Sequence, residues 1–178
     1  MIKKEARILG LAAPKGRQKQ IPVIGIVYRG NLWLDAIIVC QSIPNGPEHL
    51  QDLVKAIVRS KQYPQIHAVI LSREDLAPGL QIDISDFSRR INLPVICITE
   101  RTACRKIASQ STKEVRQVEH LSFKVSGKVA NVKIVGLNRE EAQEIFQVAC
   151  ANDQRIPEAV RVAEIIANQS RQLSFSTT

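Results

Sequence analysis

Three short apolar runs open the chain, at residues 6–12, 21–28 and 32–39. They are rich in Ile and Val, they are too short for separate helices, and Gly, Pro or Asn residues bound them, as is typical of β-strands. Only Arg29-Gly30-Asn31 separates the second run from the third, and a break of this length favours a hairpin. We therefore predict three strands, of which the second and third pair antiparallel.

The next part of the chain alternates between helical and strand patterns. Residues 48–61 carry apolar side chains at spacings of three and four, which predicts an amphipathic helix with one buried face. Short buried strands are predicted at 68–71 and 95–99, and between them Asp83 or Ser85 is the expected N-cap of a short helix. Strands that alternate with helices in this way pair in parallel through right-handed crossovers.

A helix, a hairpin and two further helices are expected in the remaining residues. In order, these elements are predicted at residues 102–120, at 121–135, after the capping residue Asn138 and from Pro157 onward. The last residues, 171–178, are expected to form a disordered tail. Because neither a repeat nor a long linker interrupts the chain, we expect a single domain across residues 1–178.

The composition is that of a soluble globular protein, with 44% hydrophobic and 24% charged residues. No apolar run approaches the ~18 residues that a membrane helix needs, and the amino terminus lacks a signal-peptide pattern. We therefore expect a cytoplasmic protein without a membrane partner. The four cysteines and three histidines are dispersed along the chain, and since structural zinc sites need closely spaced ligand pairs, we predict no metal site from them.

Much of the net charge of +8 is concentrated near the amino terminus. Residues 1–29 contain seven basic side chains and one acid, which gives this part a charge of +6, and a second basic patch spans residues 101–116. Clustered Lys and Arg favour a polyanionic partner, because neutralised phosphates release counterions, although such charge also serves solubility alone. The few aromatic residues favour contacts to a nucleic-acid backbone over base stacking.

Two motifs of phosphate and acyl chemistry are missing from the sequence. Pro14-Lys15-Gly16 lacks the second glycine and the Ser or Thr of a phosphate-binding loop. No G-x-S-x-G elbow occurs, so nothing indicates a serine nucleophile. The predicted order of three antiparallel strands, a helix and parallel strands is instead that of ribonuclease H-like domains, where acids at the strand ends hold divalent metal ions.

Five stretches resemble the pattern of one known family. They are Arg7-Ile8-Leu9-Gly10, the residues VIGIVYRG at 23–30, Trp33-Leu34-Asp35, Leu93-Pro94-Val95-Ile96 and the residues IPEAVRVAEIIA at 156–167. On these residues the chain resembles the DUF99 family of mainly archaeal proteins, which is related to endonuclease V. The resemblance implies a ribonuclease H-like α/β fold, with a mixed sheet of three antiparallel strands followed by parallel strands joined by helices, and with a carboxyl-terminal hairpin and helices.

The resemblance fails at the acids that would bind metal ions. Family members usually continue the first strand with Ile-Asp-Asp, where this chain has Leu11-Ala12-Ala13, and the fourth strand with Leu-Asp-Gly, where it has Leu71-Ser72-Arg73. Hydrolysis by two metal ions needs oxygen ligands at these positions. Ala12 offers no ligand and Arg73 repels a cation, so we expect neither a metal site nor a cofactor.

The favoured hypothesis is a catalytically inactive domain that binds nucleic acid or a nucleoprotein through a basic surface. This surface is assigned to Lys15, Arg17, Lys19, Arg29, Arg73 and Arg101. One alternative is an endonuclease that uses Mg²⁺ or Mn²⁺ and relocated acids. Its candidate residues are Asp35, Glu74, Asp75 and Asp83, of which Asp83 is equally suited to cap a helix. A second alternative is an adaptor whose last two helices hold a protein partner.

Overall fold

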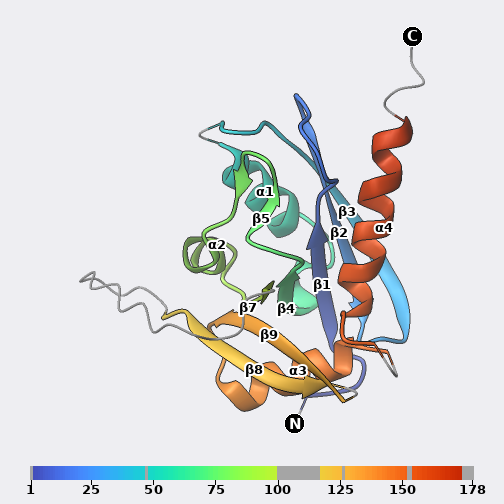
Figure 1. Ribbon diagram of the computed structural model, residues 1–178, viewed down its shortest axis with the longest axis vertical. Coiled ribbons are helices and arrows are strands. Elements are labelled where there is room, and N and C mark those ends of the chain that lie inside the picture. Colours follow the sequence, from blue (N-terminus) through green and yellow to red (C-terminus); the bar gives the residue numbers. More distant parts are fainter. Residues whose placement is uncertain (1, 47, 100–116, 126, 152–153, 174–178) are drawn as a thin grey trace.

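The described part of the chain folds into one seven-stranded mixed sheet with helices on both faces (Figure 1). The computed structural model describes residues 2–46, 48–99, 117–125, 127–151 and 154–173. Within these residues the sheet has the order β3-β2-β1-β4-β7-β9-β8. Its strands are β1 (Arg7–Ala12), β2 (Ile21–Arg29), β3 (Trp33–Ser42), β4 (Ile66–Leu71), β7 (Val95–Thr99), β8 (Glu119–Val125) and β9 (Lys128–Val135).

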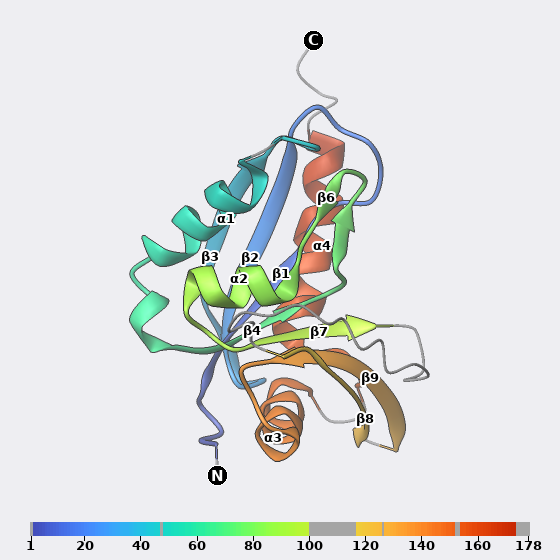
Figure 2. The same ribbon diagram turned by 90° about the vertical axis from the view of Figure 1, so that its left-hand side faces the viewer.

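Helices and two small elements complete the described structure (Figure 2). The helices are α1 (His49–Val58), α2 (Ile84–Ile91), α3 (Arg139–Ala149) and α4 (Glu158–Leu173), joined by a 3-10 turn η1 (Tyr63–Gln65) and by the hairpin of β5 (Asp75–Ala77) and β6 (Leu80–Gln81). Alternate side chains of a strand point to opposite faces of a sheet. Accordingly, Leu9 and Leu11 of β1 join the core under α1 and α2, whereas Ile8 and Ala12 join the clusters under α3 and α4.

The strand pairing confirms the predicted fold class. β1 pairs antiparallel with β2, and β2 pairs antiparallel with β3. On its other side β1 pairs in parallel with β4, which pairs in parallel with β7. β8 and β9 form the predicted second hairpin, and β9 joins the sheet antiparallel to β7. Because β1, β4 and β7 run in one direction, their carboxyl ends meet at one end of the sheet, which is where α/β folds generally place ligands.

Local sequence signals determine where α2 and α3 begin. Asp83 is the N-cap of α2, and its carboxylate accepts hydrogen bonds from the backbone nitrogens of Ser85 at 2.9 Å and Asp86 at 3.0 Å. Of the two predicted caps, Asp83 is therefore the one that is used. Asn138 and Glu141 form the predicted capping box of α3, with hydrogen bonds of 2.8 and 3.0 Å.

Three predictions about local structure are wrong in part. α4 continues to Leu173, so residues 171–173 of the expected tail are helical, and residues 174–178 lie outside the described part. Residues 119 and 120, expected at the end of a helix, open β8 because they pair with β9, and residues 102–116 of that predicted helix lie outside the described residues. The segment after β4, expected as a loop, contains the β5-β6 hairpin.

The last helix lies very close to the first strand. A Cβ atom added to Gly10 would lie 2.4 Å from the carbonyl carbon of Ala159 and 2.5 Å from the backbone nitrogen of Val160. Because no side chain fits between these two backbones, only glycine permits the approach.

No helix in the described part of the chain is long and apolar enough to cross a membrane.

Candidate nucleic-acid interface

The carboxyl ends of β1 and β4 lie side by side. The backbone nitrogen of Ser72 donates a hydrogen bond of 3.1 Å to the carbonyl oxygen of Leu11, which extends the parallel pairing of Leu11 with Leu71 by one residue. Ala12 and Ser72 therefore occupy neighbouring positions at the end of the sheet. These are the two positions at which the family resemblance would place metal-binding acids.

Ala12 is fully buried beneath α4. It belongs to an apolar cluster with Ala163 and Ala167 of that helix and with two isoleucines of β2. Ala13 is buried in the core on the opposite face of the sheet. The hydroxyl oxygen of Ser72 is also shielded from solvent, and within the described chain it has no hydrogen-bond partner. These three positions therefore offer one unpaired hydroxyl group and no carboxylate.

Basic side chains surround this end of the sheet. Lys15, Arg17 and Lys19 are exposed on the loop that follows β1, and Arg73 directly follows Ser72. Arg73 is partly buried, and its Nε atom is shielded from solvent without a hydrogen-bond partner in the described residues. Four of the six predicted basic residues thus follow the carboxyl ends of the neighbouring strands β1 and β4. We call these four residues and Ser72 the basic end.

Arg29 lies at the opposite end of the sheet, where its neighbour across the antiparallel pair is Arg7. Both guanidinium groups bind Asp35, because Arg7 Nε lies 2.6 Å from Asp35 Oδ2 and Arg29 Nη2 lies 2.9 Å from Asp35 Oδ1. The Arg29 guanidinium also lies over the ring of Trp33, 5.7 Å from its centre. The structure therefore does not bring Arg29 to the basic end, and Arg101 lies outside the described residues.

The acids considered as relocated metal ligands are dispersed, and three of them have structural partners. The hydrogen bond from Arg7, and then that from Arg29, lowers the pKa of Asp35 below its ordinary value. Glu74 Oε2 lies 2.6 Å from Lys133 Nζ, Asp83 caps α2, and Asp75 is exposed on β5. In the described part of the chain, no three His, Cys, Asp or Glu side chains are grouped so as to hold a metal ion. These residues do not fit a two-metal site.

A model of the family described as endonuclease dU matches residues 4–171. The chain belongs to this family. The UPF0215 protein of Methanosarcina acetivorans is 25% identical over 179 residues, which cover 93% of this chain and 91% of that protein. The UPF0215 protein of Methanothermobacter thermautotrophicus is 22% identical over 182 residues, which cover 94% of this chain and 88% of that protein. The predicted membership in an endonuclease V-like family is therefore confirmed.

Solved structures share the fold of this endonuclease dU family member. A protein of unknown function from Archaeoglobus fulgidus has a TM-score of 0.72 at 19% identity, and the match covers 92% of this chain and 97% of that one. Endonuclease V of Bacillus subtilis has a TM-score of 0.67 at 11% identity, with coverages of 99% and 86%. Endonuclease V of Ciona intestinalis, in complex with a 24mer DNA containing an inosine followed by a ribo-adenosine, has a TM-score of 0.62 at 10% identity, with coverages of 95% and 87%.

An ion pair with a buried carboxylate, not predicted from the sequence, lies at the start of α4 of this endonuclease dU family member. Glu158 is only 6% exposed, and its carboxylate oxygens accept hydrogen bonds from Nε of Arg161 at 3.1 Å and from Nη2 at 2.7 Å. These hydrogen bonds raise the pKa of Arg161. The spacing of three residues within the IPEAVR stretch is the signal that indicates this pair. The pair stabilises the first turn of α4, next to its contact with Gly10.

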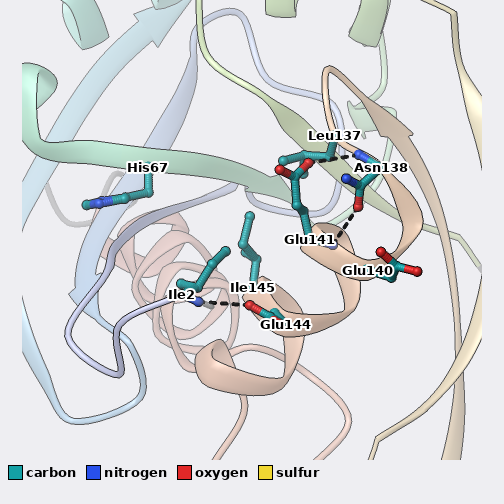
Figure 3. Close-up of a pocket in the computed structure, with 8 residues that line it drawn as sticks. All are labelled: Ile2, His67, Leu137, Asn138, Glu140, Glu141, Glu144 and Ile145. Carbon is teal, nitrogen blue, oxygen red and sulfur yellow. Dashed lines mark hydrogen bonds between the residues drawn. The ribbon is translucent and has the colours of Figure 1, made fainter.

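A pocket of about 330 Å³ lies where α3 faces the beginning of β4, away from the basic end (Figure 3). Its lining includes Glu140, Glu141 and Glu144 of α3, together with His67 and Ile2. Glu141 belongs to the capping box, and Glu144 accepts a hydrogen bond of 2.8 Å from the backbone nitrogen of Ile2. Because this lining is acidic, the pocket does not suit a polyanion, and the basic end remains the candidate interface of this family member.

Proposed function

We propose that this protein binds the phosphate backbone of nucleic acid at the basic end of its sheet and does not hydrolyse it. The observation that carries the proposal is that Ala12 and Ser72 occupy neighbouring positions at the strand ends where hydrolysis would need acids. Arg73 and the cationic loop after β1 lie next to this pair. At the strand ends where the family resemblance would place metal-binding acids, this chain therefore has groups that suit an anion.

The charge around Arg73 favours a phosphate ligand. Glu74, the nearest acid in sequence, forms an ion pair with Lys133, and within the described residues no carboxylate is paired with Arg73. A guanidinium group binds phosphate oxygens through two parallel hydrogen bonds, and such charge-assisted bonds are stronger than neutral ones. Arg73 is therefore assigned as the central contact to a phosphate group.

Two buried donors at the basic end support the same ligand. Ser72 Oγ and Arg73 Nε are shielded from solvent and lack partners in the described part of the chain. A buried donor without a partner costs about 1–3 kcal/mol. Phosphate oxygens accept hydrogen bonds from hydroxyl and guanidinium donors alike, so a phosphate that reached either atom would relieve its cost.

The comparisons support a nucleic acid as the source of this phosphate. Endonuclease V of Ciona intestinalis has the same fold and is in complex with a DNA that contains inosine. The family that this chain belongs to is itself described as endonuclease dU. We therefore assign the ligand of the basic end to a DNA or RNA strand, with strands that contain inosine or deoxyuridine as the first candidates.

A divalent-metal endonuclease is the second candidate function, and the family description favours it. It would require acids other than those at the strand ends. Three of the four candidate acids already have structural partners: Asp35 and Glu74 form ion pairs, and Asp83 caps α2. The fourth, Asp75, is exposed and forms none of these contacts. Since one exposed acid is too few for a two-metal site, we place this candidate second.

Fluorescence anisotropy with labelled oligonucleotides tests the binding proposal. We expect the wild type to bind DNA and RNA at about 50 mM salt, and we expect the affinity to fall about 100-fold by about 200 mM, as four phosphate contacts imply. A triple variant, Lys15→Gln with Arg17→Gln and Lys19→Gln, should bind far more weakly. The single variant Arg73→Gln should also reduce the slope of log K against log salt by about 1.

A matched control separates the basic end from the overall charge. Lys55, Arg59 and Lys61 are exposed at the end of α1 and just beyond it, so changing all three to Gln removes the same charge at the other end of the sheet. We expect this variant to bind almost as well as the wild type. Equal losses in the two triple variants, or no binding at about 50 mM salt, would contradict the proposed interface.

A cleavage assay tests whether hydrolysis is absent. The wild type is incubated with Mg²⁺ or Mn²⁺ and with oligonucleotides that contain inosine, deoxyuridine or only ordinary bases. We expect no cleavage above the buffer control. Cleavage that is lost in Asp75→Asn but kept in Arg59→Gln would instead establish the endonuclease and reject the non-hydrolytic assignment.

A further inference from the structure

The outer strand β3 presents an apolar surface that no described element covers. β3 pairs with β2 on one side, and within the described chain no strand pairs with its other side. Cross-strand partners share a face of the sheet. Ile24 and Ile26 pack in the cluster under α4, so their partners Val39 and Ile37 face the same side. Yet Ile37 is 51% and Val39 is 57% exposed, because α4 lies over β1 and β2 and not over β3.

A groove of about 440 Å³ runs between this face of β3 and α4. Apolar side chains line it, among them Val39 and Ile166, and the rest of the lining consists of uncharged Gln and Ser residues. Leu34, whose partner Tyr28 also packs against the α4 cluster, continues the apolar surface along β3 and is 40% exposed. We call Leu34, Ile37, Val39 and Ile166 the β3–α4 strip.

We propose that the β3–α4 strip and the free edge of β3 bind the same surface of a second copy of this chain. The two sheets then join through antiparallel β3 strands across a two-fold axis. Lys or Pro residues or a bulge usually prevent such pairing on an exposed edge strand. β3 contains neither Lys nor Pro, and the register shift in its pairing with β2 lies near its start, so residues 36–42 pair regularly. Its one charged residue, Asp35, is paired with Arg7 and Arg29. The edge is therefore close to neutral in a chain with a net charge of +8.

The charge distribution also selects the antiparallel arrangement. The loop with Lys15, Arg17 and Lys19 lies at the end of the sheet where β3 finishes, because Ser42 pairs with Ile21. Parallel pairing would place two such loops side by side. Antiparallel pairing separates them by about one strand length, roughly 33 Å, which exceeds the Debye length of ~10 Å at 0.1 M salt. A two-fold contact of this kind is self-complementary, as in most homodimers.

The edge and the strip extend along the whole outer strand. A ten-residue strand is roughly 33 Å long. The strand edges supply hydrogen bonds that fix the register, and the strip supplies the apolar contact.

Sedimentation velocity tests the proposal. The protein concentration is about 10 to 100 µM, a range that reveals dimers of moderate affinity. We expect the wild type to sediment as a dimer and Ile37→Lys to sediment as a monomer, with a dissociation constant raised at least about 100-fold. Val129→Lys is the matched control, because Val129 is 52% exposed on another strand; it should remain dimeric. Circular dichroism spectra of the wild type and of both variants serve to check that each protein is folded. A monomeric wild type, or a folded Ile37→Lys variant that stays dimeric, would overturn the proposal.

Disulfide trapping tests the antiparallel register. In an antiparallel pair centred on the middle of β3, the two copies of residue 37 lie near the two-fold axis. Ile37→Cys should therefore form a cross-linked dimer under mild oxidation, whereas Val129→Cys should not. Equal cross-linking of the two variants would show that contact is not specific to β3 and would count against the arrangement.

Discussion

Asp35 Oδ2 lies 2.6 Å from Arg7 Nε, and the other carboxylate oxygen of Asp35 is bound by Arg29. This ion triad joins β1, β2 and β3 at the end of the sheet opposite the basic end. Both oxygens are occupied by guanidinium groups, so the carboxylate offers no open position to a cation. Asp35 therefore connects β3 to β1 and β2. From the sequence alone, a role as a metal ligand was an open alternative.

We expect Asp35→Asn to destabilise the fold and to leave nucleic-acid binding unchanged. The change removes the negative partner of two guanidinium groups, and hydrogen bonds to charged groups contribute about 1.5–3 kcal/mol. Urea denaturation should show a loss of that order. Asp75→Asn, at an exposed position, should stay within about 0.5 kcal/mol of the wild type. Equal stabilities of Asp35→Asn and the wild type would disprove the structural role.

The stability that Asp35 contributes should depend on pH. Its pKa in the folded state is lowered, first by the Arg7 hydrogen bond, from an ordinary value of 3.8. A lowered folded pKa stabilises the protein above the ordinary pKa, and this contribution is lost as the pH falls through and below that value. The difference in unfolding free energy between the wild type and Asp35→Asn should therefore be constant from about pH 6 to 8 and shrink below about pH 4. A difference that grows with acidity would contradict the assignment.

Gly10→Ala should destabilise the docking of α4 on β1. The added methyl group would lie 2.4 Å from a backbone atom of Ala159, and overpacking of this kind costs about 1–3 kcal/mol. Gly25→Ala is the control, because its Cβ would meet side chains and no backbone, at 3.1 Å for the flexible ends of Leu9 and Leu11 and at 3.3 Å for the Cβ atom of Ile38. Thermal unfolding should give a clearly lower midpoint for Gly10→Ala than for Gly25→Ala. The reverse order would show that the two backbones separate easily.

Ala12→Asp should not rebuild a metal site. Ala12 is fully buried against Ala163 and Ala167, and burial disfavours the charged form of a carboxyl group, so the pKa of the new Asp would be raised. A raised folded pKa means that the variant loses stability as the pH rises above the ordinary pKa of ~3.9. Its midpoint of thermal unfolding should therefore lie further below that of the wild type at about pH 8 than at about pH 5. Specific stabilisation of Ala12→Asp by Mn²⁺, absent in the wild type, would contradict this expectation.

The strands, most helices and the fold class are readable from the sequence because they depend on local patterns. Apolar runs define β1 and β7, and Asp83 and Asn138 carry their capping chemistry within three residues of themselves. Lys15 and Arg73 follow strands that run in parallel, so the sequence pattern already assigns both residues to one end of the sheet. A hairpin reverses direction, however, and this reversal places Arg29 at the other end of the sheet, a relation that only the strand register reveals.

The burial of Ala12 and the pairing of Glu158 with Arg161 depend on contacts between distant parts of the chain. The sequence indicates that Ala12 supplies no ligand, but not that α4 covers it. Likewise, a spacing of three residues indicates that Glu158 and Arg161 are neighbours on a helix, but not that the Glu158 carboxylate is buried. Such features follow from packing, which no local pattern specifies.

The close contact of Gly10 with Ala159 has a consequence for synthesis on the ribosome. β1 is synthesised well before α4, so the face of β1 and β2 that α4 covers stays open until α4 has also left the ribosome. At about 5–20 residues per second, this interval lasts on the order of ten seconds. A nascent chain that stalls before α4 would expose an apolar sheet face, and such chains are the ones that chaperones and proteases would have to clear.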